Sequence, residues 1–315
     1  MPQVVYRDLM LEVMLPIALL IAAGGWWRRS LGLEGVASVR RYISTIVINL
    51  FAPALLFASA ATARFDGELL SVPLLLMTSI FLSWAILHVL TGWFARHAQL
   101  TTTSRAALML SGMFGNVLFI GYPVLHYIDG EAGGQYAVFA DMGASTPLLW
   151  AVGVWVSTHI GAKVRDPGHP VINWLKLPPV WAFAVGVILG HTGWPIEKLV
   201  HAARFIGQPA VPVMLLMLGL SIPWGQLVPR REAMLIIVWK LGVLPGLIWL
   251  LARQWYGELH PAQAAAVLES GVPTMLMALS LADRYRLDVE LTALIIAWTT
   301  ILYLFTLPAW LALLA

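Results

Sequence analysis

Long apolar segments separated by short polar ones recur along the whole chain. A helix needs about 20 mainly apolar residues to cross the hydrocarbon core of a bilayer. Ten segments meet this requirement: 9–27, 42–61, 69–93, 105–127, 135–160, 178–194, 199–222, 233–255, 261–282 and 289–314. The connecting loops are short, at most about 18 residues. The pattern predicts an all-α membrane protein with ten transmembrane helices and no soluble domain.

The composition agrees with a chain whose surface faces lipid. Hydrophobic residues make up 60% of the 315 and charged residues only 11%, whereas a soluble domain has about 25% charged residues. The basic residues are scattered between apolar segments, so no nucleic-acid partner is expected. Cysteine is absent, which excludes disulfides and thiolate metal sites. No motif indicates a cofactor, a metal or ATP bound to this chain.

The distribution of lysine and arginine predicts an orientation. Loops that follow odd-numbered spans hold 13 of these residues, and the N-terminus and the other loops hold five. Because basic loops stay in the cytoplasm, the odd-numbered loops are expected inside. We therefore expect a multi-pass protein of a bacterial inner membrane with both termini outside.

The second and seventh spans carry the same polar and proline pattern. Asn49 precedes Pro53 by four residues, and Gln208 precedes Pro212 by four residues, at an offset of 159. Proline inside a span frees backbone groups that lipid cannot satisfy. We expect helix breaks at Pro53 and Pro212. A single such proline would more simply be read as a kink.

The fourth and ninth spans share a second pattern. Gly121-Tyr-Pro123 and Gly271-Val-Pro273 lie mid-span, 150 residues apart. Matching breaks in two halves predict a repeat of five spans in 1–161 and another in 162–315. Since five is odd, the second repeat is inverted relative to the first. Inverted repeats with interrupted helices near the midplane are typical of secondary carriers.

The same residues carry a family resemblance that runs the length of the chain. Three segments carry it: Asn116-Val-Leu-Phe-Ile-Gly121-Tyr-Pro123, Pro53-Ala-Leu-Leu-Phe57, and Gly271-Val-Pro273 with the C-terminal helix pair that follows it. In these segments the sequence resembles the auxin efflux carrier family. That family includes bacterial malonate and malate permeases. The family is similar in fold to the bile-acid sodium symporters. The resemblance implies a scaffold and a transport core that work by an elevator-type mechanism. It also implies that broken helices 4 and 9 cross, and a homodimer is possible.

The resemblance also implies a substrate site at the crossing. Asn116 would donate its amide to a substrate carboxylate, while Pro123 and Pro273 shape the breaks. The substrate-binding residues expected from these patterns are Asn116, Gly121, Pro123, Gly271, Pro273, Asn49 and Gln208.

Three ionisable residues inside spans are candidates for coupling to H⁺ or Na⁺, because charge within the bilayer is costly and rarely without a role. Glu269 precedes Pro273 by four residues and is the first candidate; a structural hydrogen bond is the alternative. Asp141 could reach the core or lie near the outer interface. Lys240 could extend to the cytoplasmic interface or pair with an acid or the substrate.

These observations predict a secondary transporter that exports a small organic anion. The family resemblance implies that this anion is a carboxylate. A channel-like or receptor-like membrane protein is an alternative. An intramembrane enzyme is a further one, but the usual catalytic motifs are missing, so no enzyme activity is expected.

Overall fold

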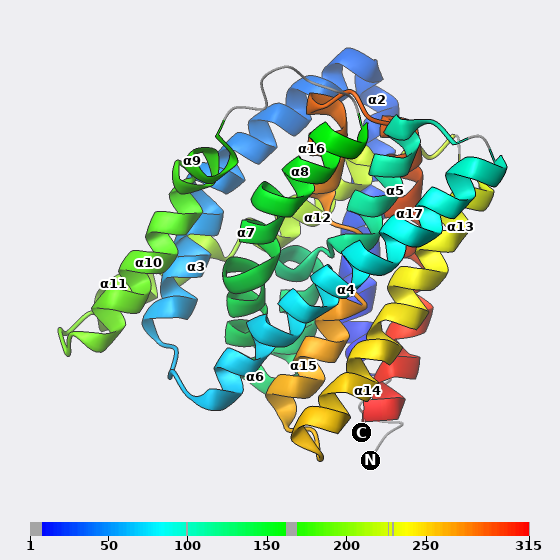
Figure 1. The fold of residues 1–315 in the computed structure, drawn as a ribbon. Helices are drawn as coiled ribbons and strands as arrows, with labels where there is room; N and C mark the ends of the chain where they lie inside the picture. The colour runs from blue at the N-terminus through cyan, green and yellow to red at the C-terminus, as the bar shows by residue number, and fades with distance from the viewer. Residues whose placement is uncertain (1–7, 99, 162–168, 226, 229, 315) are drawn as a thin grey trace.

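The computed structural model describes residues 8–98, 100–161, 169–225, 227–228 and 230–314, and its regular structure is helical apart from one isolated backbone bridge (Figure 1). The α-helices are α2 (Leu15–Ile46), α3 (Ala52–Ala61), α4 (Gly67–Ala98), α5 (Thr102–Met113), α6 (Tyr122–Ala140), α7 (Thr146–Leu148), α8 (Val154–Val156), α9 (Pro170–Leu175), α10 (Pro178–His191), α11 (Glu197–Gly207), α12 (Ala210–Ser221), α13 (Arg231–Val238), α14 (Leu244–Tyr256), α15 (Pro261–Ser270), α16 (Leu276–Arg284) and α17 (Val289–Leu314). Single π-helical turns connect several of them: η1 (Met10–Met14), η2 (Val47–Phe51), η3 (Val117–Gly121), η4 (Asp141–Ser145), η5 (Leu149–Gly153), η6 (Ser157–Gly161) and η7 (Trp239–Val243).

Seven helical stretches of the described residues are long and apolar enough to cross a membrane: Met10–Gly32, Glu34–Ala61, Gly67–His97, Val117–Gly161, Glu197–Ser221, Arg231–Tyr256 and Val289–Leu314. The other predicted spans are short or interrupted. Segment 178–194 forms the 14-residue helix α10, and segment 261–282 is divided between α15 and α16. Ten transmembrane helices and an inverted repeat therefore stay predictions. The predicted repeat boundary and the loop residues Lys163 and Arg165 fall at or within 162–168, outside the described residues.

Most of the π turns precede a proline. Pro16, Pro53, Pro123, Pro147 and Pro245 each occupy the second residue of the α-helix that follows a π turn. Proline has no N–H, and its ring clashes with the carbonyl four residues earlier. A turn widened by one residue removes this clash without ending the helix. Prolines in this chain thus widen helices more often than they interrupt them.

This finding corrects the expected breaks at Pro53 and Pro212. The helix continues through η2 into α3, because the residue before Pro53 keeps right-handed helical angles. In the seventh span the irregular turn lies earlier, at Gln208 and Pro209, between α11 and α12. Pro212 lies in the first turn of α12, where its missing N–H would have had no helical partner.

On one side of the molecule, helices pack closely because glycine residues lie at their contacts. Gly24 of α2 and Gly219 of α12 each face the backbone of the opposite helix, and a Cβ at either position would overlap it. Gly186 and Gly190 of α10 similarly lie against the backbone of α3. Small residues let helices approach closely in lipid, where apolar side chains gain little from contact. Figure 1 shows α3, α10 and α11 together on one side, apart from the bundle that contains α4, α5 and α17.

The second group of helices encloses the most deeply buried segments. Helix α4 packs against α5, α6 and α15, while α17 packs against α5 and α13. All residues of α5 from Ala106 to Met113 are buried, and so are all residues of α15 from Ala265 to Ser270. These two helices end inside the protein, which brings their carboxyl ends to the candidate site.

Candidate substrate-binding site

Two interrupted helices meet in the interior. Helix α5 ends at Met113 before η3 begins at Val117, and α15 ends at Ser270 before α16 begins at Leu276. The segments between them run antiparallel, with Gly115 opposite Thr274. The backbone N–H of Asn116 donates to the carbonyl of Pro273 at 2.7 Å, and that of Met275 donates to the carbonyl of Phe114 at 3.0 Å. Each interruption thereby satisfies backbone groups that the other leaves free, which is necessary where lipid or packed side chains exclude water.

The contact between the segments corrects the register expected from the Gly-x-Pro motifs. Gly271 and Pro273 do lie in their interruption, but Gly121 lies in η3 and Pro123 in α6, after the other interruption has ended. Gly115 and Thr274 are the facing residues, and they are 159 residues apart (274 minus 115). This is the offset of the Asn49/Gln208 and Pro53/Pro212 pairs. The 150-residue spacing of the Gly-x-Pro motifs therefore does not relate residues that face one another in the paired segments.

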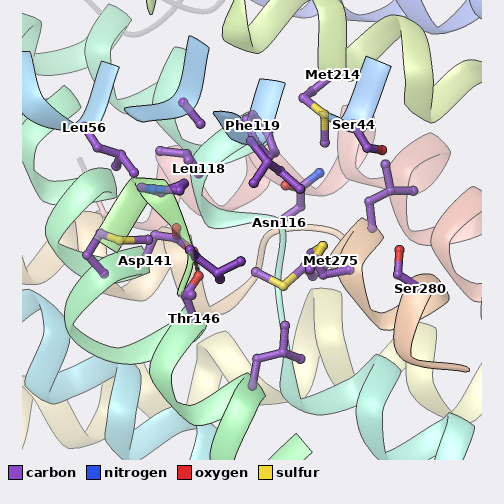
Figure 2. A pocket seen from close by; sticks show the side chains of 18 of the residues that line it. Ser44, Leu56, Asn116, Leu118, Phe119, Asp141, Thr146, Met214, Met275 and Ser280 are labelled. Carbon is purple, nitrogen blue, oxygen red and sulfur yellow. Dashed lines mark hydrogen bonds between the residues drawn. The ribbon is translucent and has the colours of Figure 1, made fainter. Parts of the chain in front are cut away.

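A cavity of about 110 Å³ lies beside the paired segments. It is bounded by the amino ends of the two continuing helices, through Leu118 and Phe119 of η3 and Leu276 and Met277 of α16. Its polar lining residues come from four helical elements and from the interrupted segment before η3, and Figure 2 shows their side chains around a common space: Ser44, Asn116, Asp141, Thr146 and Ser280. Most of the remaining lining is apolar and includes Met214, Met217, Met275 and Trp150. A small solute with one polar end fits this lining.

Asn116 and Asp141 are the polar residues of this cavity with the strongest binding chemistry. Asn116 is 4% exposed, and its side chain makes no hydrogen bond to another described residue. Asp141 is also 4% exposed and accepts a hydrogen bond from the Thr146 hydroxyl at 3.1 Å. Among the described residues that line the cavity, none is lysine, arginine or histidine. The cavity thus offers an amide, an acid and hydroxyls, but no basic side chain.

Glu269 lies behind the interruption and lines neither of the two cavities described here. Its side chain is fully buried, and neither carboxyl oxygen has a hydrogen-bond partner in the described structure. Both oxygens pack against Gly121, where a Cβ would overlap them. Gly121 therefore makes room for the acid, and the two residues fix the distance between η3 and α15. The structural hydrogen bond considered for Glu269 is not made by the described residues.

Lys240 is buried next to the same interruption. It is 1% exposed, and its ammonium donates to the carbonyl of Ser270, the last residue of α15, at 2.9 Å. A cation favours this position because the carboxyl end of a helix carries partial negative charge and unpaired carbonyls. The proposed extension to the cytoplasmic interface is wrong, since the side chain points to the interior. Its pairing is with a backbone carbonyl, within electrostatic reach of Glu269.

A second, larger cavity of about 730 Å³ follows the first along α3 and α12. Pro123 and Gln208 line it, together with Tyr122, His126, His201 and Glu12. Glu131 of α6 and Arg204 of α11 also line it and form an ion pair of 2.9 Å. Pro123 and Gln208 are expected beside Asn116 from the sequence, but in the structure they line a different cavity.

The remaining predicted residues have structural surroundings. Asn49 is exposed, lines neither cavity and donates its amide to the carbonyl of Thr45 at 2.7 Å. Gly271 packs against Pro245, and Pro273 contributes its carbonyl to the paired segments. Sequence analysis did not identify Ser44, Thr146 or Ser280. Thr146 could have been noticed, because it follows Asp141 by five residues and precedes Pro147. Ser44 and Ser280 carry no comparable signal.

Comparison with known proteins decides the family. A family model described as "Membrane transport protein" matches residues 9–157 and 171–311. This chain belongs to that family, which includes the auxin efflux carriers. A relative named "Uncharacterized transporter" from Methanothermobacter thermautotrophicus is 30% identical over 287 residues, covering 89% of each chain. A second transporter of that description, from Methanocaldococcus jannaschii, is 26% identical and covers 93% of this chain and 96% of its own.

Membership has two direct consequences. The apolar helices belong to an integral, multi-pass membrane protein. The membrane transport family is also not a family of enzymes. Because the matched ranges include both interrupted helices, the paired segments and their cavity lie within the part of the chain that the family model covers.

Proposed function

We propose that this protein is a secondary carrier that moves a small organic carboxylate across the inner membrane by alternating access. The observation that carries the proposal is the cavity of about 110 Å³ between the amino ends of two half-helices, with the unpaired Asn116 amide facing it.

The chemistry of this cavity favours the carboxylate. Helix amino ends carry partial positive charge and unpaired N–H groups, so they favour an anion. The Asn116 side chain offers an N–H donor from the same side. Interrupted helices whose amino ends face an anionic substrate group are a known solution in carriers. The apolar lining, rich in methionine, adapts to the carbon end of the solute.

The two cavities support alternating access. Along the second span, the small cavity is lined from Ser44 to Leu56 and the large one from Leu55 to Ser59, while Pro16, Ile17 and Leu20 of the first part of α2 also line the large one. Along α12 the small cavity includes Met214 and the large one Leu215. The two linings thus follow one another along the same spans and meet at an apolar layer of neighbouring residues, Leu55 and Leu56 on one span and Met214 and Leu215 on the other. Movement of the paired segments past this layer would transfer the substrate from one cavity to the other.

Helix packing supports the proposed inverted repeat and scaffold. Helix α2 is kinked at Gly32, which separates span 1 from span 2. If spans 1–5 match spans 6–10, the pair of α12 and the part of α2 before Gly32 (spans 7 and 1) is equivalent to the pair α10–α3 (spans 6 and 2). Both pairs pack closely and both use glycine against backbone. The facing residues Gly115 and Thr274 of the two interruptions are 159 residues apart, the same offset that relates Asn49 to Gln208. These four helices would form the scaffold, and the helices around α5 and α15 the moving core.

The direction of transport follows from coupling. A free anion is driven out of a cell by roughly 2.3 kcal/mol per charge for each 100 mV of membrane potential. Export of a carboxylate therefore needs no coupling ion, whereas uptake needs one. With the odd-numbered loops in the cytoplasm, both termini would lie outside.

Counterflow in proteoliposomes tests the proposal. Vesicles loaded with unlabelled pyruvate, lactate, acetate or malonate are diluted into the same labelled acid. A carrier accumulates label transiently by exchange, and we expect this for at least one acid. Simple equilibration without overshoot would indicate a channel. No uptake of any of the four acids would reject a small carboxylate as the substrate.

A further inference from the structure

We infer that Asp141 carries one proton together with each carboxylate, so that the cavity binds the pair H⁺ plus monoanion and transport is electroneutral. This inference rests on the proposed function and adds the coupling ion and the coupling residue. It also differs from the expectation drawn from the sequence, which ranked Glu269 first because it is close to Pro273.

The size of the cavity is the first reason. A cavity of about 110 Å³ is somewhat smaller than the roughly 150 Å³ that hold a benzene molecule. It therefore fits an acid of about four to six non-hydrogen atoms. A solute of that size cannot place its carboxylate far from Asp141, which lines the same space. Two like charges that share a small site cannot both remain ionised, so one of the two carboxyls takes a proton.

The lining residues give the second reason. A basic side chain could neutralise one of the two carboxylates, but no described lining residue is lysine, arginine or histidine. Lys240 is the nearest buried cation, and its ammonium is bound to the carbonyl of Ser270 outside the lining. The helix amino ends and Asn116 can stabilise one negative charge, and a proton on Asp141 removes the second.

The position of the acid gives the third reason. Asp141 is the first residue of the π turn η4, directly after α6, and Thr146 donates to its Oδ1 at 3.1 Å. Hydrogen bonding through one oxygen leaves Oδ2 without a partner among the described residues, and the cavity lies beside it. π turns inside helices frequently occur at functional sites. Figure 2 shows Asp141 and Thr146 on one side of the cavity and Asn116 on another.

No other titratable side chain on the described elements that pack against η4 lines the cavity, so none of them can carry this proton in contact with the substrate. Helices α4, α6 and the turn η3 pack against η4. Turn η3 has no titratable side chain, and none of the titratable residues of α4 and α6 lines the small cavity: Glu68, His88, Arg96, His97, Tyr122, His126, Tyr127, Asp129, Glu131 and Tyr136. From α15, Glu269 acts on Asp141 electrostatically but is enclosed against Gly121.

The test compares three variants in proteoliposomes that contain the full chain: Asp141→Asn, Glu269→Gln and, as a matched control at an exposed acid, Glu290→Gln. The probe is whichever of the three monocarboxylates pyruvate, lactate and acetate gives counterflow with the wild type. Counterflow reports exchange alone, whereas uphill accumulation driven by an alkaline interior reports proton coupling when it exceeds the accumulation in protein-free vesicles, into which the undissociated acid diffuses by itself.

We expect the wild type, Glu269→Gln and Glu290→Gln to accumulate the probe when the interior is alkaline. Asp141→Asn should lose this accumulation, because an amide resembles the protonated acid and cannot release the proton; counterflow measured on the same vesicles reports how much exchange the variant retains. In binding measurements the wild-type affinity should fall by up to tenfold per pH unit at high pH, as one linked proton requires. The affinity of Asp141→Asn should change less than twofold over the same range.

The outcomes separate the inference from the proposed function. Absence of counterflow in the wild type rejects the carboxylate carrier before any variant is measured. Counterflow with pH-driven accumulation that persists in Asp141→Asn overturns the inference alone. Loss of accumulation in Glu269→Gln but not in Asp141→Asn assigns the coupling to Glu269 and also overturns it.

A second variant covers the case in which Asp141→Asn does not yield folded protein. Thr146→Val keeps the acid and removes only the hydroxyl that donates to it. Because this hydrogen bond favours the charged form, its loss should move the midpoint of pH-dependent binding to higher pH by up to one unit. An unchanged midpoint in folded Thr146→Val contradicts the role of Asp141.

Discussion

Asp141 and Glu269 are two buried acids near the paired segments, and their surroundings differ. Asp141 lines a cavity and has one hydroxyl partner. Glu269 is enclosed against Gly121, has no hydrogen-bond partner in the described residues and has Lys240 as its nearby cation. A carboxyl that exchanges protons with a solute needs contact with the space that the solute occupies. The comparison separates an acid placed for exchange from one placed in a packed interior.

The difference has a physical origin in the two helix ends. Glu269 lies in the last turn of α15, where the partial negative charge of the helix opposes a carboxylate. Lys240 compensates by binding the carbonyl of Ser270 at that end. Asn116 instead directly precedes the amino end of η3, where an anion is favoured. One interruption thus presents an electropositive end to the cavity, and the other keeps its electronegative end covered.

The enclosed side is tested most strongly by Gly121→Val. The added side chain would overlap the carboxyl of Glu269 and force α15 away from η3. Overpacking of this kind, against a carboxyl enclosed in the packed interior, should cost about 3 kcal/mol or more of stability. Thermal unfolding of purified protein measures the loss. Gly242→Ala is the matched control, because nothing lies within 4 Å of a Cβ there; equal stability of the two variants would contradict the close contact.

The cavity side is tested by Asn116→Ala. Removing an amide that donates to a carboxylate should cost about 1.5–3 kcal/mol of binding, or roughly tenfold to a hundredfold in affinity, while the protein stays folded. Counterflow at varied probe concentration and a thermal-shift titration measure this. Unchanged affinity removes Asn116 from the site. Asn49→Ala is the matched amide variant, and we expect a change of less than twofold because Asn49 is exposed.

Lys240→Met tests whether the cation supports the enclosed end of α15. The variant keeps most of the buried side-chain volume and removes the bond to the Ser270 carbonyl. An unsatisfied buried carbonyl should cost about 1–3 kcal/mol, measured by thermal unfolding. Substrate affinity should change less, because Lys240 does not line the cavity. A large loss of affinity with normal stability would mean that Lys240 binds substrate instead.

Arg204→Ala should have the smallest effect. Its ion pair with Glu131 joins α11 to α6 across the large cavity, but the two side chains are 45% and 55% exposed. Exposed ion pairs contribute about 0–1 kcal/mol, so the unfolding temperature should change little. If this contact also holds the core against the scaffold, counterflow rates should increase at high salt in the wild type and become independent of salt in the variant.

Several features of the site were predictable from sequence because they depend on local chemistry. Gly271-Val-Pro273 cannot continue an α-helix easily, and the interruption does lie there. Gly121-Tyr-Pro123 was placed wrongly, because η3 widens the helix and accommodates Pro123 without a break. The first interruption lies instead at Phe114, Gly115 and Asn116, where hydrogen bonds from the partner segment hold the chain extended.

The sequence by itself determined that this chain enters a membrane and that one helix is interrupted at Gly271-Val-Pro273. Apolar length and proline chemistry are both local properties. Only the tertiary structure decided that Asn116 and Asp141 share a cavity while Glu269 does not. The distance of an acid from a proline along the chain does not specify which side of a helix faces the cavity; the packing of η3, η4 and α15 against one another does.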